Sequence, residues 1–217
     1  MGREHLFEQL LAALDAGHVV ANERTFDKGD IVFHQGDPGD SLHLVREGMF
    51  AIRASTPLGT ILIVDILVPG DVFGEFAVFS NQRRRTTAVT ALSPGATLVV
   101  DREQLRAAIG FRPELAEELI ATIIGKAEST TQRLVEMLHV PAELRVLRAL
   151  LSMATLEDAS SPVRLTQDEL ASFAATTRPT ANRVLRREKE RGTVELSRGQ
   201  VVVLDRQRLA ERAGVDP

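Results

Sequence analysis

The sequence predicts an α+β protein in which a β-rich N-terminal part is joined by one long helix to a mainly helical C-terminal part. Short β-branched runs alternate with turn residues over residues 24–100, which favours many short strands. Apolar residues then recur at helical spacing over residues 113–139, and helix-sized segments with a hairpin pattern follow. We therefore expect three parts, over residues 1–112, 113–139 and 140–217.

Residues 3–16 have the apolar spacing of an amphipathic helix. In the β-rich region that follows, glycines such as Gly36, Gly48 and Gly70 mark turns between strand-sized runs. Many short strands at this spacing indicate a compact β-roll, and a short helix over residues 102–109 follows it. The expected strands are Asp30–His34, Ser41–Val45, Phe50–Arg53, Ile61–Leu67, Thr86–Ala91 and Ala96–Asp101.

Pro113 opens the long helix, which we expect to end near His139. Its apolar positions are spaced by three or four residues, as in a coiled-coil seam. A helix packed on its own domain is the alternative, and we favour a dimer seam because this helix joins two dissimilar regions. The positions of the expected seam are Leu115, Leu119, Ile123, Ala127, Thr130, Leu134 and Met137.

The C-terminal part predicts three helices followed by a hairpin, which is the order of a winged helix. A polar loop over residues 156–162 separates the first helix from a pair joined by a tight turn, and a hairpin forms around Gly199. The expected helices are Ala142–Thr155, Thr166–Ala174 and Pro179–Arg191, and the expected strands are Val194–Leu196 and Val201–Leu204. The inner apolar face of the helix pair consists of Leu170, Phe173, Ala174, Val184 and Leu185.

Bulk composition excludes several classes of protein. The chain has no cysteine, so disulfides, thiolate metal sites and cysteine nucleophiles are impossible. No two of its histidines have metal-binding spacing, so we expect no metal site. No apolar run is long enough to cross a membrane, and the N-terminus has no signal-peptide core, so we expect a cytoplasmic protein with no membrane partner. The histidines are His5, His18, His34, His43 and His139.

The net charge of −4 is unevenly distributed along the chain. Residues 141–217 carry 13 Lys and Arg against 11 Asp and Glu, whereas residues 1–140 carry 13 against 19. The basic side chains concentrate in residues 178–191, which hold six basic and two acidic residues. A helix that is locally basic can bind phosphates even in a chain that is acidic as a whole.

A candidate anion site lies between Gly74 and Thr86. A glycine at a strand end lets the backbone approach an anion closely, and a helical turn after it directs free N–H groups to the same place. Arg85 offers a planar guanidinium and Thr86 a hydroxyl to a phosphate, while Glu75 would accept from a ligand hydroxyl such as a ribose 2′-OH. The alternative is that residues 83–85 form a solvated charged loop.

With these residues, and with Gly36, Gly48 and Gly70 at the turns of the roll around it, the segment resembles the phosphate-binding cassette of the catabolite activator protein (cyclic-AMP receptor protein) and fumarate–nitrate regulator family. That cassette has a Gly-Glu pair, a short spacer and an Arg-Ser/Thr pair. The resemblance implies that Gly74, Glu75, Arg85 and Thr86 hold the ribose and cyclic phosphate of cyclic AMP, with Phe76 beside them.

In that family the long helix also contacts the adenine, partly from the other subunit, through adjacent small hydroxyl residues. A register set by Leu138 places the family's Thr-Ser pair on Glu128 and Ser129, which is a departure at the first position. Glu128 would accept from the adenine amino group, or Thr130 would take over that contact. The resemblance therefore adds Glu128, Ser129 and Thr130 to the ligand-binding residues.

The segment from Leu165 to Leu185 resembles the family's helix-turn-helix, in which the first turns of the second helix reach base edges. Arg suits guanine, Asn suits adenine, and further basic residues reach phosphates. Where the best-known members carry Glu after the first recognition Arg, this chain has Pro179, which is tolerated there but pushes Arg178 out of helical geometry. The residues expected to contact DNA are Thr177, Arg178, Pro179, Thr180, Asn182, Arg183, Arg186, Arg187 and Lys189.

The resemblance spans about residues 5 to 210 and implies a homodimeric transcription regulator rather than an enzyme. Cyclic AMP would favour the dimer conformation that binds double-stranded DNA, and RNA polymerase is a further candidate partner. One alternative keeps the fold but responds to another ligand or binds DNA constitutively. A second is a metal-dependent enzyme of cupin type, for which His34 and His43 would be the only imidazoles in the barrel.

Overall fold

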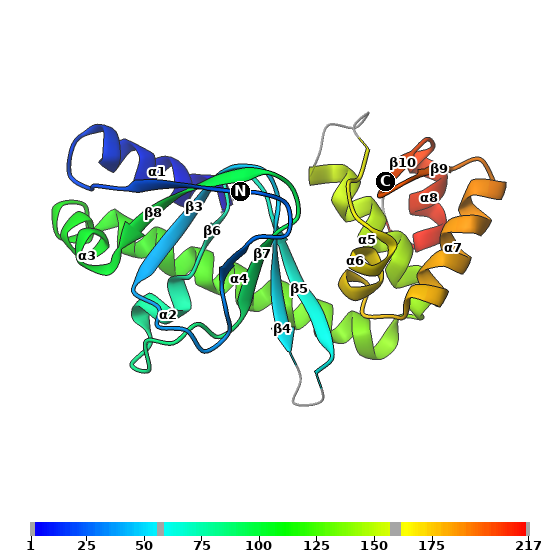
Figure 1. Cartoon of the computed structure of the whole chain (residues 1–217), viewed down its shortest axis with the longest axis horizontal. Helices are drawn as coiled ribbons and strands as arrows, with labels where there is room; N and C mark the ends of the chain where they lie inside the picture. The colour runs from blue at the N-terminus through cyan, green and yellow to red at the C-terminus, as the bar shows by residue number, and fades with distance from the viewer. Residues whose placement is uncertain (1–2, 56–58, 157–161, 216–217) are drawn as a thin grey trace. The chain divides into compact units, whose positions relative to one another are not determined.

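In the computed structural model the chain folds into two compact units (Figure 1). The described residues are 3–55, 59–156 and 162–215, so most of the polar loop expected over residues 156–162 lies outside them. The first unit consists of Met1–Gly59 and Val64–Thr130, and the second of Thr60–Ile63 and Thr131–Pro217. The boundary between the units falls within the long helix, and the predicted three-part division stays a prediction.

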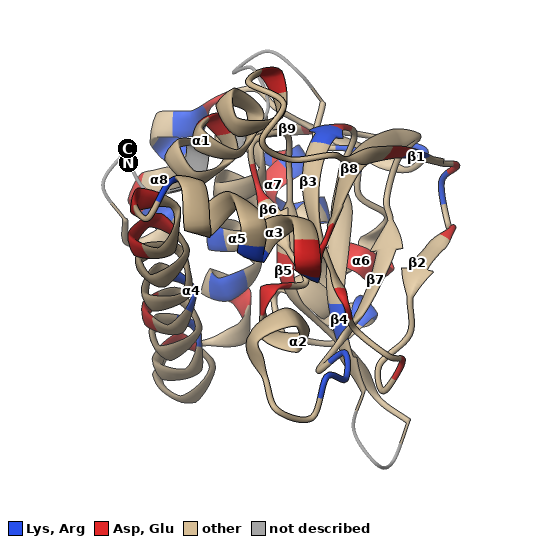
Figure 2. Cartoon of the chain, turned by 90° about the vertical axis from the view of Figure 1, so that its left-hand side faces the viewer, with Lys and Arg blue, Asp and Glu red and all other residues tan. Residues whose placement is uncertain are grey.

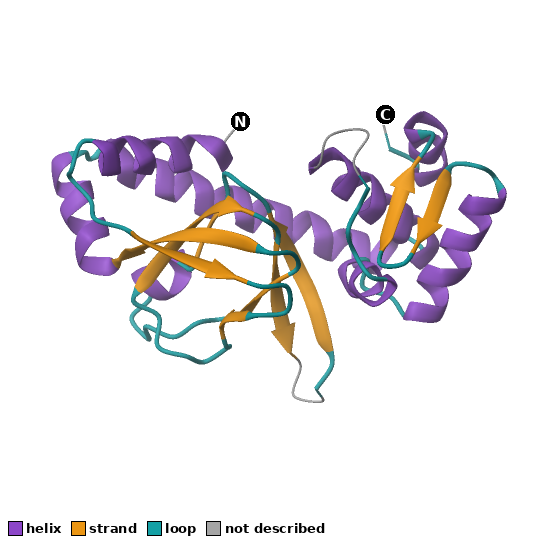
Figure 3. Ribbon diagram, turned by 45° about the horizontal axis from the view of Figure 1, so that its top comes forward, coloured by secondary structure: helices purple, strands orange, loops and turns teal. Residues whose placement is uncertain are grey.

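Two four-stranded sheets form the body of the first unit (Figure 3). The strands are β1 (Asn22–Phe26), β2 (Ile31–Phe33), β3 (Ser41–Glu47), β4 (Phe50–Ser55), β5 (Ile61–Leu67), β6 (Val72–Phe73), β7 (Ala88–Ala91) and β8 (Gly95–Asp101). One sheet has the order β1-β8-β3-β6 and the other β2-β7-β4-β5. The turn glycines Gly36, Gly48 and Gly70 have φ of 90°, 80° and 94°, a backbone conformation that other residues rarely adopt.

The first unit has two hydrophobic cores because both faces of β3 are covered. Val45 of β3 packs between the sheets in a cluster that includes the fully buried Phe50 and Phe73. Leu42 and Leu44, on the other face, pack in a second cluster to which the three longer helices of the unit contribute most of the helical residues. These helices are α1 (Arg3–Asp15), α3 (Arg102–Phe111) and α4 (Glu114–His139). Burying each such side chain stabilises the fold by about 1.5–3 kcal/mol.

The face of the long helix α4 that the sequence predicted as a seam is buried only in part, because Ala127, Thr130, Leu134 and Met137 are exposed. Leu115 and Leu119 are buried in the core of the first unit, so their assignment to a dimer seam was wrong. Ile123 is partly buried, whereas Ile120 and Ile124 are more than half exposed. The exposed positions recur with alternating spacings of four and three residues at Ile120, Ile124, Ala127, Thr131, Leu134 and Leu138.

The second unit contains three helices, a hairpin and a short final helix. The elements are α5 (Ala142–Leu156), α6 (Gln167–Phe173), α7 (Arg178–Glu190), β9 (Val194–Ser197), β10 (Gln200–Val203) and α8 (Arg206–Ala213). Thr166 and Glu169 form a capping box at the start of α6, which satisfies backbone N–H groups that have no partner within the helix. The predicted inner face, from Leu170 to Leu185, is buried at all five positions. The predicted winged helix is therefore confirmed.

Three elements were not predicted from the sequence, and the expected position of Arg178 outside the recognition helix was wrong. In β1 only the last of five residues is buried, so the strand shows no alternation. Strand β6 has only two residues, and α8 is a short, highly charged helix that buries Leu209, Ala210 and Ala213. Pro179 does not exclude Arg178 from the recognition helix, because α7 begins at Arg178 and proline is accommodated in its first turn.

Candidate functional site

The turn between β6 and the short helix α2 (Glu75–Phe79) can be made only by glycine. Gly74 has φ of 91°, and a Cβ placed on it would lie 2.5 Å from Nη1 of Arg85 and 2.9 Å from the carbonyl oxygen of Ser41. Both distances are shorter than real Cβ contacts, so any side chain here would displace Arg85. The sequence Gly74-Glu75 therefore brings the backbone of the turn against the guanidinium.

Arg85 is the centre of this arrangement and is almost completely buried. Its Nη1 donates to the carbonyl oxygens of Ser41 (2.9 Å) and Gly74 (3.2 Å), and its Nη2 donates to Oγ of Ser41 (2.8 Å). The guanidinium also lies 4.1 Å from the ring centroid of Phe33. Its Nε is buried without a hydrogen-bond partner, so the site contains an N–H group that a ligand or a water molecule can satisfy. The solvated-loop alternative is wrong for this arginine, although Arg83 and Arg84 are exposed.

Glu75 is also buried, and its partner comes from the long helix. Nζ of Lys126 lies 2.7 Å from Oε1 of Glu75 and also donates to the carbonyl oxygen of Val72 at 2.7 Å. Burying a carboxylate is costly unless it is paired, and Lys126 supplies the pairing charge. The sequence reasoning missed Lys126, because nothing in its local pattern connects it with Glu75.

The other predicted ligand residues lie on α4, some on the same side of the helix as Lys126 and one on another side. The hydroxyls of Ser129 and Thr130 both donate to the carbonyl oxygen of Lys126, one helical turn before them, so they share its side of α4. Glu128 is exposed and lies two positions after Lys126, which directs it to another side of the helix. A contact from Glu128 to a ligand in the same chain is therefore not supported, and a contact to a second copy stays a prediction.

Thr86 and Phe76 border the arrangement. Thr86 is exposed beside the buried Arg85, and Phe76 is 47% exposed on α2. The loop that follows α2 carries the basic residues drawn in blue there in Figure 2. A ligand that bound Arg85 would thus meet an open hydroxyl and an aromatic side chain on the solvent side.

His43 lies beneath this site on β3. Its ring stacks on Phe73 at 4.8 Å between centroids, and its Nδ1 lies 3.2 Å from Oγ1 of Thr97. Burial, with the positive charges of Arg85 and Arg24, lowers the pKa of His43 to about 3. The imidazole is therefore neutral at physiological pH, and it adds no charge to the site.

A second candidate site is formed by α6 and α7 in the second unit. Ala175, in the tight turn between them, has φ of 49°, which is the left-handed conformation that glycine usually supplies. Arg145 of α5 holds this turn through hydrogen bonds from Nε to the carbonyl oxygen of Ala174 (3.0 Å) and from Nη2 to that of Ala175 (2.8 Å). The sequence reasoning did not identify Arg145, which fixes the angle between the two helices from outside the motif.

The residues predicted to contact DNA are not equally exposed. Asn182 is partly buried, and its Oδ1 lacks a hydrogen-bond partner, while Thr180 is partly buried beside Thr177 with 3.1 Å between their hydroxyl oxygens. The other predicted contact residues are exposed: Thr177, Arg178, Pro179, Arg183, Arg186, Arg187 and Lys189. The exposed side of α7 is therefore strongly basic, as a phosphate-binding surface requires.

The part of the chain that the structure describes holds no cluster of three or more side chains able to bind a metal ion. Among the same residues, no helix is long and apolar enough to cross a membrane.

Comparisons with known proteins match two parts of the chain to family models. Residues 23–110 match the model of the cyclic nucleotide-binding domain, and residues 144–212 match that of the Crp-like helix-turn-helix domain. The chain is 32% identical to the "CRP-like cAMP-activated global transcriptional regulator" of Mycobacterium tuberculosis, over 87% of this chain and 86% of that protein. It is 31% identical to the "Cyclic AMP receptor protein" of Thermus thermophilus, over 88% and 87% of the two chains.

The fold is also found among solved structures. FixK2 from Bradyrhizobium japonicum superposes with a TM-score of 0.80 at 22% identity, covering 92% of this chain and 98% of that one. At this identity the similarity concerns the fold alone.

Proposed function

The chain belongs to the CRP/FNR family of transcription regulators, and from this premise we propose that cyclic AMP is its effector and that it binds DNA as a homodimer. The observation that carries the effector is the meeting of Gly74, Glu75 and Arg85 at one buried place. One relative, 32% identical to this chain, is named as a cAMP-activated regulator, and another, 31% identical, is named as a cyclic AMP receptor protein. The cupin-type enzyme is not favoured, because both matched domains are those of regulators.

The ligand would use groups that now bind the protein itself. The cyclic phosphate would accept from Arg85 and from the hydroxyl of Thr86, and the ribose 2′-OH would donate to Glu75. Lys126, which now neutralises Glu75, would place a second cation beside the phosphate. Ligand binding would thereby rearrange contacts of the long helix, and it could shift the dimer only by binding one conformation more tightly than the other.

Isothermal titration of cyclic AMP against the full chain tests the site. We expect Arg85→Ala to weaken binding by about 1.5–3 kcal/mol, which is tenfold or more, because a charge-assisted contact to phosphate is lost. Arg84→Ala is the matched control, since Arg84 is the exposed neighbour and should leave the affinity unchanged. Equal affinities of the wild type and the Arg85 variant would refute this site. DNA binding without any cyclic AMP binding would favour another ligand or constitutive activity.

The homodimer would form along the exposed apolar positions of α4. Ile120, Ile124, Leu134 and Leu138 are each at least half exposed in the single chain, although such side chains are usually buried. Together with Ala127 and Thr131 they are spaced alternately by four and three residues, as in two helices packed side by side. This seam keeps Ala127 and Leu134 of the predicted one and has Ile124 in place of Ile123.

In the proposed DNA complex, the exposed side of α7 enters the major groove. Pro179 cannot accept a hydrogen bond from cytosine, so one base pair per half-site should be read weakly. Selection of binding sites from a random pool, with wild type and Pro179→Glu, tests this placement. Sharper preference for one base pair in the variant supports it, whereas identical preferences would show that position 179 does not face the groove.

A further inference from the structure

The arginines of α7 fall into two groups according to their place around the helix. Ala181, Val184 and Leu185 form the buried side. With 3.6 residues per turn, Arg183 and Arg186 lie opposite that side, on either side of Pro179. Arg178 and Arg187 lie on the two flanks between the outward and buried sides. Arg186 makes no ion pair with any described residue, whereas both flanking arginines do.

The partners of the flanking arginines are carboxylates of the neighbouring helices. Nη1 of Arg178 lies 3.1 Å from Oδ2 of Asp168, in the first turn of α6. On the other flank, Nη1 of Arg187 lies 3.3 Å from both carboxylate oxygens of Glu143, in the first turn of α5. Arg183, from the outward side, approaches the same carboxylate at 3.3 Å. Three of the arginines predicted to contact DNA are thus already paired with carboxylates of their own unit.

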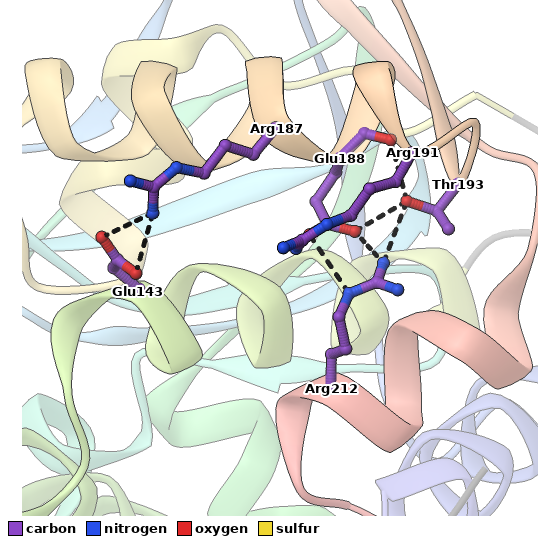
Figure 4. A network of polar contacts seen from close by, with 6 residues as sticks. All are labelled: Glu143, Arg187, Glu188, Arg191, Thr193 and Arg212. Carbon is purple, nitrogen blue, oxygen red and sulfur yellow. Dashed lines mark hydrogen bonds and ion pairs between the residues drawn. The ribbon is translucent and has the colours of Figure 1, made fainter.

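In each of these ion pairs the carboxylate can be replaced by another anion. All five side chains involved are about half exposed, between 45% for Glu143 and 63% for Asp168, and ion pairs in water contribute little. The next residue of α7 shows the contrast: Glu188 is buried and held by Thr193, Arg191 and Arg212, whereas the Glu143–Arg187 pair stands apart from it (Figure 4). One set of contacts can be replaced by a ligand, and the other is part of the fold.

We propose that Asp168 and Glu143 take the place of DNA phosphates in the free protein and limit the affinity of α7 for duplex of any sequence. A helix in the major groove presents its outward side to base edges and its flanks to the two phosphate strands. Phosphates on the flanks would meet Arg178 and Arg187 where the carboxylates now lie. This inference rests on the proposed DNA binding.

The consequence is an electrostatic cost that does not depend on sequence. Each arginine must leave or share its carboxylate to reach a phosphate, and the carboxylate then stands near the DNA backbone. Removing one carboxylate charge should tighten binding by about two- to fivefold per site at low salt, and less as salt screens the repulsion. The slope of the logarithm of the binding constant against the logarithm of the salt concentration should become steeper by up to about 0.9 for each phosphate contact that no longer has to displace a carboxylate.

The test is fluorescence anisotropy with a labelled duplex of random sequence and with the site selected above, from about 50 to 200 mM salt. It uses the full chain with saturating cyclic AMP, as wild type, Asp168→Asn and Glu143→Gln. Glu211→Gln is the matched control, because it removes the same charge from an exposed position of α8 in the same unit. Circular dichroism melting checks that each variant is folded, since both carboxylates lie in the first turn of a helix.

We expect both variants to bind both duplexes more tightly and with a steeper salt dependence, while the control matches wild type. Unchanged affinity and salt dependence in both variants would overturn the inference and leave the proposed function standing. An equal gain in Glu211→Gln would also overturn it, because bulk charge would then explain the effect. A folded wild type that binds neither duplex would overturn the proposed function itself.

Discussion

The buried carboxylate of Glu188 should be a main determinant of stability in the second unit. It connects the end of α7 with the start of β9 and with α8, because it accepts from Oγ1 of Thr193 at 2.7 Å, from Nη1 of Arg191 at 2.9 Å and from both Nε and Nη2 of Arg212 (Figure 4). Burial raises the pKa of Glu188, but these hydrogen bonds outweigh it and hold the pKa below its ordinary value. The folded state therefore favours the charged form.

We expect Glu188→Gln to destabilise the second unit by about 2 kcal/mol at pH 7. Hydrogen bonds to charged groups contribute about 1.5–3 kcal/mol, and breaking a fully buried pair costs about 3–5 kcal/mol. Arg191 is 54% exposed, so its ion pair contributes little to stability. Arg212 is 29% exposed and can turn to water when Glu188 is lost, which places the expected cost near the lower end of these ranges.

Urea unfolding followed by far-ultraviolet circular dichroism measures this change, since the chain has no Trp or Tyr for fluorescence. Because the folded pKa is depressed, the stabilisation is present above the unfolded pKa of about 4.3 and is lost as pH falls through the folded pKa. The difference between wild type and Glu188→Gln should therefore be full at pH 7 and should shrink below about pH 4.

Glu190→Gln is the control, because Glu190 is an exposed carboxylate on the same helix and should change stability by less than about 0.5 kcal/mol. A double variant with Arg212→Met should cost less than the sum of the two single changes, since both remove one interaction. A Glu188→Gln protein as stable as wild type, or a difference that is independent of pH, would refute the reasoning.

Three further predictions concern other elements. Because the pKa of His43 is lowered to about 3, protonation favours the unfolded chain, and stability should fall as pH drops below about 6.5. In His43→Leu the urea midpoint should therefore vary less with pH between about pH 6.5 and 5 than it does in wild type. An unchanged pH profile would contradict this. Ala175→Gly should stabilise the protein by about 0.5–1 kcal/mol in thermal unfolding, because glycine adopts its positive φ without strain; a loss of stability would show that the turn is unstrained. Glu at both Ile124 and Leu134 should give monomers in sedimentation, with melting as the folding control, and a folded dimer would mean that the subunits meet elsewhere.

Local pattern was enough to predict most elements of the fold. Strands β3 and β5 have apolar residues between turn residues, and the helix-turn-helix carries apolar residues at helical spacing on one face only. It also singled out Gly74 and Arg85, which the structure brings into contact. Elements without such a pattern, such as the mostly exposed β1, gave no signal.

Long-range pairing decided the rest. The partner of Glu75 is Lys126, 51 positions away, and Arg85 binds Ser41, 44 positions away. On α4 the spacing of apolar residues identifies a helix, but it does not say which apolar side packs against the helix's own unit. Both Leu119, which is buried, and Ile120, which is exposed, fit the spacing of a seam. The sequence alone therefore determined the kinds of element and the chemistry that each carries. Only the tertiary structure decided which charges neutralise each other and which apolar side stays exposed, because both depend on surfaces that meet only after the chain has folded.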